Sequence, residues 1–529
     1  MSARPKKLVL TYVDSLRTDM LERAVAEERA PTFAALLERG VLIPDCVSSF
    51  PSVTPVACSE LVTGVAADQH WISGMNWYHR LEKRYVEYGS SLDATRAFGV
   101  FRALYDLVYN MNLAHLSPEV ETLFEQLDDA GARTACTPFL IYRGRHRHQV
   151  SLEGLMRRAI ETTRLKFRHH TWGPAELFYG DLYASREVPC RSTSIPGVRD
   201  GYSACCAAEL IKEDGFDFLL FSLADNDNYS HRHGPEETVE SIAKADSCFA
   251  KLIEAAGGLD EFLDEHAVIV VADHAQTDVH RGLPLAELLG REWSILQPSD
   301  DRPELAQLAI SPTGRAAHIY LLPGEGEPVE PAALTAQLTV TEGVDLVCRL
   351  EDGEGRPLRR VDPGIPTSGG EWAVVERGAQ VLRFRPAGKG NGGGGRDGPG
   401  NGRREVSDRR AGRWLLEGDL AALTATVESE HFDSQDYPDA LARVWSALTA
   451  PHAGDFIVSL AEGFEAVDWG GVSHAGGGSH GSLLAGDSLG PLLFVGCGPD
   501  SADARDQWTL RDVAPVIREH FGLTENGEG

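Results

Sequence analysis

Six short apolar runs, each followed by polar residues, constrain the fold of this chain more than any other feature. The runs are rich in β-branched side chains and cover residues 8–13, 216–223, 267–272, 316–322, 455–460 and 491–496. Short continuous apolar runs are typical of strands buried on both faces, as in a parallel sheet. In an open α/β sheet, reactive groups gather just beyond the carboxyl ends of the strands. The residues that follow each run are therefore the first candidates for function.

Helical patterns lie between these runs. Residues 31–39 form one, with Pro31 suited to the first helical position and Gly40 suited to the position after the last turn. Residues 238–256 form another, which ends before two glycines. The alternation predicts an α/β fold, with a mostly parallel central sheet sandwiched by helices.

The sequence changes character between residues 297 and 450. Short strand-like pieces occur at 373–375 and 380–384, and residues 386–404 form a Gly-rich, basic segment. Such a segment cannot bury enough apolar surface to become ordered, so we interpret it as a flexible loop. We predict a core made of residues 1–296 and 451–529, interrupted by a smaller α+β insertion or cap at 297–450.

Composition disfavours several classes of protein. A net charge of −29 over 529 residues argues against a nucleic-acid duplex as partner. The nine cysteines are scattered and form no CxxC pair, which favours buried free thiols over a disulfide framework or a thiolate zinc site. The chain has no long apolar run and no recognisable secretion signal, so we expect a cytoplasmic protein with no membrane partner. The sequence makes no prediction of the oligomeric state.

Metal-ligating side chains follow three of the runs. Asp14 follows the first, Asp227 and His231 follow the second, and Asp273 and His274 follow the third. Carboxylates and imidazoles are suitable ligands for a divalent ion. The alternatives are a capped strand end for Asp14, a polar surface loop for Asp227 and His231, and a solvated strand end for Asp273 and His274.

Two further segments add a hydroxyl and more imidazoles. Thr54 precedes a proline and a short helical stretch, so its hydroxyl can lie at a helix N-terminus, which favours a phosphoryl group. A simple N-cap is the alternative. His474 and His480 stand in a Gly-rich segment before the last apolar run, where glycines let the backbone approach a metal or a phosphate. An ordinary Gly-rich turn is the alternative there.

The order and spacing of these motifs resemble the alkaline phosphatase superfamily and, within it, the type I phosphodiesterase/nucleotide pyrophosphatase family. The matching stretches are Val13-Asp14…Arg17, Thr54…Thr63-Gly64, Asp227…His231…Gly234-Pro235, Asp273-His274 and His480-Gly481. They bracket roughly residues 1–295 and 451–525. The resemblance implies a metal-dependent hydrolase of phosphodiester or phosphoanhydride bonds that acts on a small phosphorylated substrate such as a nucleotide.

The resemblance also implies roles for individual residues. One divalent metal would be held by Asp227, His231 and His480, and a second by Asp14, Asp273, His274 and the Thr54 oxygen. Zinc is the ion implied, and nitrogen and oxygen ligands would also accept manganese. The two ions would outweigh the three aspartate charges and so help to ionise the hydroxyl of Thr54, the implied nucleophile, which would form a phospho-threonine intermediate.

Asn76 lies about one residue away from the place where the family has a phosphate-binding asparagine, and an asparagine in a structural turn is the alternative. His233 has no assigned role, and His474 competes with His480 for the first metal. Three other functions remain open. A phosphomonoesterase or a phosphomutase would use the same metals, and a non-catalytic metal-binding interaction module would use none of the chemistry.

Overall fold

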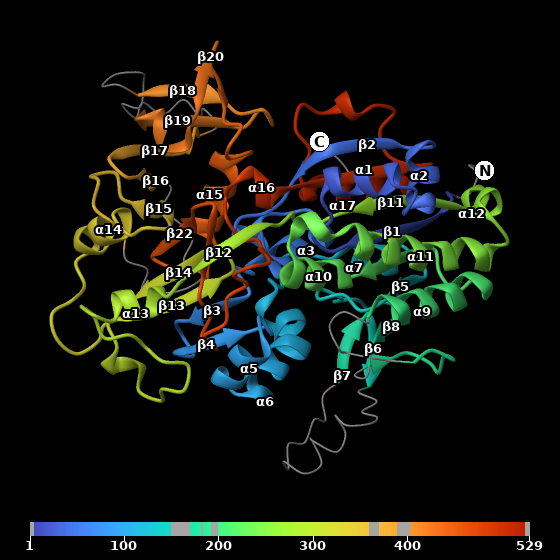
Figure 1. Ribbon diagram of the computed structural model, residues 1–529, viewed down its shortest axis with the longest axis horizontal. Helices are drawn as coiled ribbons and strands as arrows, with labels where there is room; N and C mark the ends of the chain where they lie inside the picture. The colour runs from blue at the N-terminus through green and yellow to red at the C-terminus, as the bar shows by residue number, and fades with distance from the viewer. Residues whose placement is uncertain are drawn as a thin grey trace.

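The computed structural model describes residues 5–149, 170–180, 183–191, 199–358, 370–388 and 403–523. Two large sheets make up most of the structure, and helices cover the first of them (Figure 1). Within the described ranges, no helix is both long and apolar enough to cross a membrane.

The first sheet has eight strands in the order β2-β25-β11-β1-β10-β5-β8-β9. Their bounds are β1 Lys7–Val13, β2 Val41–Val47, β5 Thr134–Cys136, β8 Glu176–Tyr179, β9 Tyr183–Ala184, β10 Phe218–Leu223, β11 His266–Val271 and β25 Leu489–Val495. Strand β1 pairs in parallel with β10 and β11, β10 with β5, and β5 with β8. Strand β25 runs antiparallel to β11. The predicted mostly parallel central sheet is confirmed.

Helices cover both faces of this sheet because its central strands are apolar on both sides. Leu8 and Leu10 of β1 pack into one core cluster, and Val9 and Val13 pack into another. Burial of each such side chain stabilises the fold by roughly 1.5–3 kcal/mol. The first cluster includes side chains of α3 Thr54–Thr63, α7 Leu123–Asp129 and α17 Val513–His520. The second includes α1 Thr18–Ala26, α2 Pro31–Leu37, α9 Asp200–Lys212, α11 Val239–Ala256 and α12 Leu259–Glu265.

Both predicted helices are present. The pattern at residues 31–39 corresponds to α2, which ends two residues earlier than predicted, and the pattern at 238–256 corresponds to α11. Gly257 adopts a left-handed conformation (φ 101°) directly after α11, as the glycine pair suggested.

The second sheet has ten strands in the order β13-β14-β22-β15-β16-β17-β19-β18-β21-β20. Their bounds are β13 Leu308–Thr313, β14 Ala316–Leu321, β15 Val344–Glu351, β16 Trp372–Arg377, β17 Gln380–Pro386, β18 Arg404–Ser407, β19 Arg413–Gly418, β20 Thr426–Glu428, β21 His431–Asp433 and β22 Phe456–Leu460. The helices of this region are α13 Leu285–Leu289, α14 Pro331–Thr339 and α15 Ala440–Thr449. The short apolar pieces predicted at 373–375 and 380–384 lie in β16 and β17.

Placing the runs 316–322 and 455–460 in a parallel sheet is wrong. They form β14 and β22, which pair antiparallel with each other in the second sheet. Both faces of β22 are nevertheless buried, because Ile457 packs in one apolar cluster and Phe456 and Val458 pack in another. Continuous apolarity reports burial on two faces, and it does not report strand direction.

The division of the chain into 1–296, 297–450 and 451–529 stays a prediction. Strand β22, from the predicted C-terminal part of the core, pairs with β14 and β15 from the predicted insertion. Most of the predicted flexible loop, residues 389–402, lies outside the described residues.

The prediction that all cysteines are free thiols is wrong for one pair. Cys190 and Cys205 form a disulfide, with Cα atoms 5.7 Å apart. The bond joins Cys190, which precedes α9, to Cys205 within that helix, a pairing that cysteine spacing does not reveal. The other seven cysteines are free, and all of them except Cys497 are buried.

A small third sheet connects the two large ones. Strand β12 Thr277–Leu283 pairs in parallel with β23 Gly463–Ala466 and antiparallel with β24 Gly478–Ser479. Because Thr277 pairs with Ser479, this sheet holds the residues after β11 beside the residue that follows β24, which is His480.

Candidate active site

The carboxyl ends of β1, β10 and β11 meet at one edge of the first sheet. The parallel pairing places Val13 beside Leu223 and Tyr12 beside Val271. The chain then continues into Asp14, whose N–H donates to Leu223 O at 3.0 Å, and into Asp273, two residues beyond β11. The register of three strands therefore brings candidate ligands from distant parts of the sequence together.

The first group at this edge contains Asp14, Asp273 and His274. Their ligand atoms all lie within 4.8 Å of one another, and all three side chains are buried. His274 Nε2 lies 3.1 Å from Asp273 Oδ2 and 4.0 Å from Asp14 Oδ1. Thr54 Oγ1 lies 3.3 Å from the same nitrogen. The structure thus brings together the four residues that the resemblance assigned to the second metal.

Thr54 is the first residue of α3, and the sequence explains why the helix begins there. Val53 is extended, and Pro55 suits the first turn because it needs no N–H partner. The nine residues after Thr54 are all buried, whereas Thr54 itself is partly exposed. Gly64 closes the helix in a left-handed conformation (φ 75°). The hydroxyl therefore stands at the helix N-terminus, where the positive end of the helix dipole favours an anion.

The second group contains Asp227, His231 and His480, whose ligand atoms also lie within 4.8 Å of one another. Asp227 Oδ1 lies 3.3 Å from His231 Nε2 and 3.6 Å from His480 Nε2. The expected polar loop after β10 is in fact α10 Asp225–His233, so Asp227 and His231 share a helix face at a spacing of i,i+4. This group matches the implied first metal set.

Hydrogen bonds to backbone carbonyls orient all three imidazoles. Nδ1 of His231 donates to Gly478 O at 2.7 Å, that of His480 to Ser52 O at 2.8 Å, and that of His274 to Ala275 O at 3.2 Å. A carbonyl oxygen only accepts, so Nδ1 carries a proton in each ring and Nε2 is the nitrogen that faces the carboxylates. This is the arrangement in which an imidazole binds a metal through Nε2.

Three residues that the sequence did not single out connect the two groups. Ser15 donates from N to Asp273 Oδ1 at 3.1 Å and from Oγ to Asp227 Oδ1 at 2.8 Å. Gln276 Nε2 donates to Asp227 Oδ1 at 2.6 Å, and Tyr12 OH donates to Asp273 Oδ2 at 2.9 Å. All three stand within three residues of a predicted ligand, which is the only signal for them in the sequence.

The electrostatics of the site call for added positive charge. Burial raises the pKa of Asp14 well above its usual range, and the charges of Asp273 and Asp227 raise it further. Burial raises the pKa of Asp273 to about 6 and lowers that of His274 to about 4. Burial alone would raise the pKa of Asp227, but His231 and the other two imidazoles hold it well below the usual value.

These observations test whether the residues suit divalent ions. Asp14 Oδ1 is buried and has no hydrogen-bond partner among the described residues. It faces a second carboxylate and an imidazole, which are the donors that zinc and manganese accept. Repelling carboxylates with an unsatisfied oxygen are stabilised by a cation, so the group of Asp14, Asp273 and His274 is suited to a metal. The group of Asp227, His231 and His480 is suited to one by its donors, one carboxylate and two imidazoles.

His474 and His233 lie beside the second group with other partners. His474 Nδ1 lies 2.8 Å from Glu465 Oε1, and its ring stacks on His231 with centroids 4.0 Å apart. The His233 ring lies tilted against the Tyr229 ring, with centroids 4.4 Å apart. The geometry therefore favours His480 over His474 as the ligand that completes the set.

Asn76 begins β3 Asn76–His79, which forms a hairpin with β4 Arg84–Glu87. Its Nδ2 donates to Pro312 O, while its Oδ1 is a buried acceptor with no hydrogen-bond partner among the described residues. The backbone N–H of the preceding Met75 donates to Thr313 Oγ1 at 3.1 Å. These contacts attach Asn76 to the end of β13, so its predicted contact with phosphate stays a prediction.

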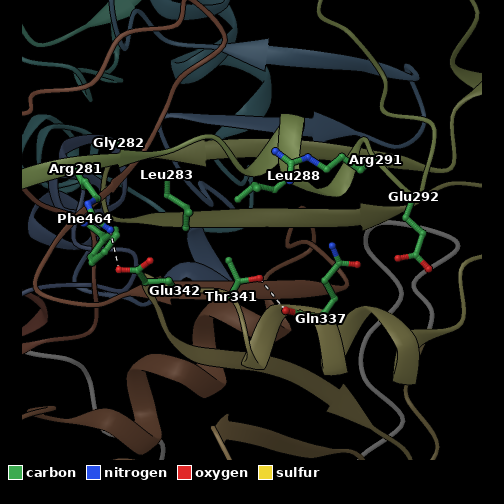
Figure 2. Close-up of a pocket in the computed structure, with 10 residues that line it drawn as sticks. All are labelled: Arg281, Gly282, Leu283, Leu288, Arg291, Glu292, Gln337, Thr341, Glu342 and Phe464. Atoms are coloured by element: carbon green, nitrogen blue, oxygen red, sulfur yellow. Dashed lines mark hydrogen bonds and ion pairs between the residues drawn. The ribbon is translucent and has the colours of Figure 1, made fainter.

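A cavity of about 590 Å³ opens elsewhere, between β12, α13 and α14 (Figure 2). Leu283, Leu288 and Phe464 contribute apolar surface, and Arg281 forms an ion pair with Glu342 at 2.7 Å at its rim. None of the candidate site residues lines this cavity, so it is separate from the site at the edge of the first sheet.

Comparison with known proteins agrees with this geometry. Murine ectonucleotide pyrophosphatase/phosphodiesterase 5, in an inactive form in complex with AMP, is 13% identical, with a TM-score of 0.53 over 99% of this chain and 97% of that chain. Phosphonoacetate hydrolase from Sinorhizobium meliloti 1021, in complex with phosphonoformate, is 14% identical, with a TM-score of 0.51 over 98% of this chain and 95% of that chain. At such identities the likeness establishes the fold.

A search of curated proteins found no match. The family model described as type I phosphodiesterase / nucleotide pyrophosphatase matches residues 8–330, which is more than half of the chain and includes every candidate residue except His480. The chain therefore belongs to the type I phosphodiesterase/nucleotide pyrophosphatase family, and it is a phosphoric ester hydrolase.

Proposed function

We propose that the protein hydrolyses phosphodiester or phosphoanhydride bonds with Thr54 as nucleophile, through a phospho-threonine intermediate. One observation carries the proposal. Thr54 Oγ1, at the start of α3, lies 3.3 Å from His274 Nε2 in the buried group that also contains Asp14 and Asp273. A hydroxyl in that position has no structural need for two carboxylates and an imidazole around it, whereas a nucleophile requires activation.

We assign two divalent ions to the site, with zinc as the first choice and manganese as the second. Asp227, His231 and His480 would hold one, and Asp14, Asp273, His274 and the Thr54 oxygen would hold the other. When bound, the ions supply the positive charge that ionises a hydroxyl and offsets the charge on phosphoryl oxygens.

The residues of the chain then have defined tasks. Thr54 Oγ forms a bond to phosphorus, the bond from phosphorus to the leaving oxygen breaks with its electron pair, and the hydroxyl proton passes to solvent. The positive end of the α3 dipole, where Thr54 stands, stabilises the charge on the phosphoryl oxygens. Water then attacks phosphorus, the bond from phosphorus to Thr54 breaks, and the hydroxyl is regenerated.

The proposed substrate is a small phosphorylated compound such as a nucleotide. AMP in the murine neighbour and phosphonoformate in the bacterial one support this class of ligand. The net charge of −29 argues against a nucleic-acid duplex, because a broad phosphate footprint needs a basic surface. A small substrate needs only local positive charge, which the two ions would provide.

The reaction is tested on bis-p-nitrophenyl phosphate and p-nitrophenyl phosphate, after the bound metals have been quantified. We expect the diester to be cleaved at least about 10-fold faster than the monoester, a difference of about 1.4 kcal/mol in transition-state binding. A preference for the monoester would replace the proposal with a phosphatase. Protein with both metals that cleaves neither ester would indicate the interaction module. Chelator-treated protein serves as the control.

We also propose a cytoplasmic location, which the disulfide makes testable. Cytosolic reductants keep thiols reduced, so the Cys190–Cys205 pair should be open in cells if the location is correct. Lysis of the native host directly into denaturant and an alkylating reagent exposes the buried thiols, and mass spectrometry should then show all nine cysteines labelled. Labelling of only the seven free cysteines would place the protein in an oxidising compartment.

A further inference from the structure

Beyond the residues assigned above, we propose that Arg443 is a positioning residue of the metal centre: it holds the loop that leads to Thr54 against the segment that follows His480. Arg443 lies on α15, in the segment 297–450 that the family resemblance left without a role. The inference rests on the proposed function, because it concerns the distance between the nucleophile and one metal ligand.

The segment after His480 has little regular structure of its own. It runs from β24 to β25 and contains one helix of four residues, α16 Ala485–Ser488. Figure 1 shows α15 and α16 between the two large sheets. A short irregular segment that carries a ligand needs contacts from its surroundings to fix the side chain within the tolerance of a catalytic site.

One anchor of this segment is direct. Ser52, two residues before Thr54, accepts the His480 Nδ1 proton on its carbonyl oxygen at 2.8 Å. Ser52 Oγ donates to Ser482 O at 2.9 Å, and Gly481 N donates to Ser52 Oγ at 3.1 Å. The nucleophile loop and the His480 segment are therefore joined residue to residue, and their spacing sets the distance from Thr54 to His480.

A second anchor is a buried ion pair on the opposite side. Arg315 and Asp487 are both fully buried, with Nη1 and Oδ1 2.6 Å apart. Asp487 Oδ2 accepts from Ser482 N at 3.0 Å, and Arg315 N donates to His480 O at 2.7 Å. The carbonyl oxygen of Asp487 accepts from Ala275 N, next to His274. This anchor fixes the segment to the strand that follows the other metal group.

Arg443 supplies the third anchor, and its contacts are unusual for an arginine. It is buried, and its guanidinium makes five hydrogen bonds. Two go to Ser49 O at 2.8 and 3.2 Å, one to Leu483 O at 3.1 Å and one to Ser488 Oγ at 2.6 Å. The fifth goes to Pro438 O at 3.0 Å. The fork thus spans the loop before Thr54 and both ends of the turn after His480.

The cation is retained in spite of its burial. Burial lowers the pKa of Arg443 to about 10, although Asp439 and Glu60 act in the opposite direction. A buried charge persists only when its donors are satisfied, and here carbonyl and hydroxyl oxygens of the two active-site loops satisfy them. The planar fork of arginine matches several acceptors at fixed angles, and the ammonium of lysine does not. Arg443→Lys should therefore keep the positive charge but no longer fix the spacing between the loop before Thr54 and the segment after His480.

Arg80 offers a matched control. Its side chain is also buried, donating to Ala453 O at 2.7 Å and to Asp455 Oδ2 at 3.1 Å. It joins the β3–β4 hairpin to the second sheet, as Arg443 joins α15 to the core. These hydrogen bonds, unlike those of Arg443, reach neither the loop before Thr54 nor residues 480–488. Arg80→Lys therefore measures the general cost of replacing a buried arginine that bonds backbone oxygen.

The experiment measures binding of zinc to the full chain by equilibrium dialysis and elemental analysis, with thermal unfolding alongside. The wild type must first bind two ions, and failure there contradicts the proposed function rather than this inference. We expect Arg443→Lys to lower the affinity for one of the two zinc ions about 10–100-fold, as loss of support around a ligand does. The affinity for the other ion should stay unchanged. The kcat of Arg443→Lys should recover at high zinc concentration.

Arg80→Lys should lower thermal stability to a similar extent and leave both zinc affinities unchanged. Equal zinc binding by Arg443→Lys and the wild type, or equal weakening in both variants, overturns the inference. If Arg443→Lys does not fold, Ser488→Ala removes one of the five hydrogen bonds and leaves the arginine in place. Ser488→Ala should lower the affinity for the same zinc ion to a smaller degree. Unchanged affinity in that variant likewise overturns the inference.

Discussion

Replacing Thr54 by alanine is expected to lower kcat by about 10⁵-fold and to abolish covalent labelling by substrate, because removal of a nucleophile costs turnover on that scale. The hydroxyl lies 3.3 Å from His274 Nε2, and the neighbouring serine hydroxyls have other partners. Ser15 Oγ lies in the cluster, where it donates to Asp227 Oδ1 at 2.8 Å. Ser52 Oγ donates to Ser482 O, and Ser59 Oγ donates to Pro55 O within α3. Each of those two oxygens is committed to a structural bond away from the cluster.

The labelling experiment has two matched controls. Thr54→Ser keeps a hydroxyl on the same side-chain carbon, Cβ, so it should stay within about 100-fold of the wild type and still form the phosphoryl adduct. Ser59→Ala removes a buried hydroxyl one turn along the same helix and should retain both turnover and the adduct. Acid quenching followed by peptide mass spectrometry locates the phosphoryl group. An adduct or substantial turnover in Thr54→Ala would remove Thr54 from this role.

Much of the site could be predicted from the sequence because the ligands stand directly after buried strands. Asp14 and Asp273 follow β1 and β11 by one and two residues, and the parallel pairing of those strands brings them together. The predicted central sheet and both helices were confirmed for a similar reason, since their apolar pattern is local. The choice between His474 and His480 was not local, because it depends on Glu465, which binds the first of them.

The parts that the sequence did not predict depend on contacts between distant segments. Ser15 reaches Asp227 across 212 residues, and a serine after an aspartate is too common to indicate this. The direction of β22 depends on its partners β14 and β15, and its apolar pattern reports only that both faces are buried. Asp227 and His231 were expected on a loop because their polar segment hides the helical period of α10.

Asp14→Asn is expected to change stability in opposite directions with and without metal. In metal-free protein, Asp14 Oδ1 is buried without a hydrogen-bond partner, and Asp273 and Asp227 repel its charge. The folded pKa is raised, so the stability that the carboxyl contributes is present below its unfolded pKa and is lost as pH rises through the folded value. At pH 8, above the unfolded pKa, the carboxyl is therefore a cost that the neutral amide lacks.

We expect metal-free Asp14→Asn to be roughly 1–3 kcal/mol more stable than metal-free wild type at pH 8, with a smaller difference at pH 5. With zinc the order should reverse, because the wild type gains the binding energy of an ion that the amide holds poorly. The same variant should lose about 10³-fold or more in kcat, since one metal group lacks a charged ligand. Urea unfolding at both pH values, with chelator and with zinc, measures all four stabilities.

If Asp14→Asn is the more stable protein without metal and the less stable one with zinc, Asp14 is a metal ligand rather than a residue that merely caps a strand. A capping carboxylate stabilises the fold through hydrogen bonds that its amide keeps only in part, so its replacement would destabilise the protein with and without metal, and at both pH values. Asp14 accepts no such bond on Oδ1, and its nearest charged neighbours are two carboxylates and an imidazole. Uniform destabilisation would therefore contradict the metal group at Asp14, Asp273 and His274. The reversal would show that the group of Asp14, Asp273 and His274 destabilises the fold until a cation binds to it.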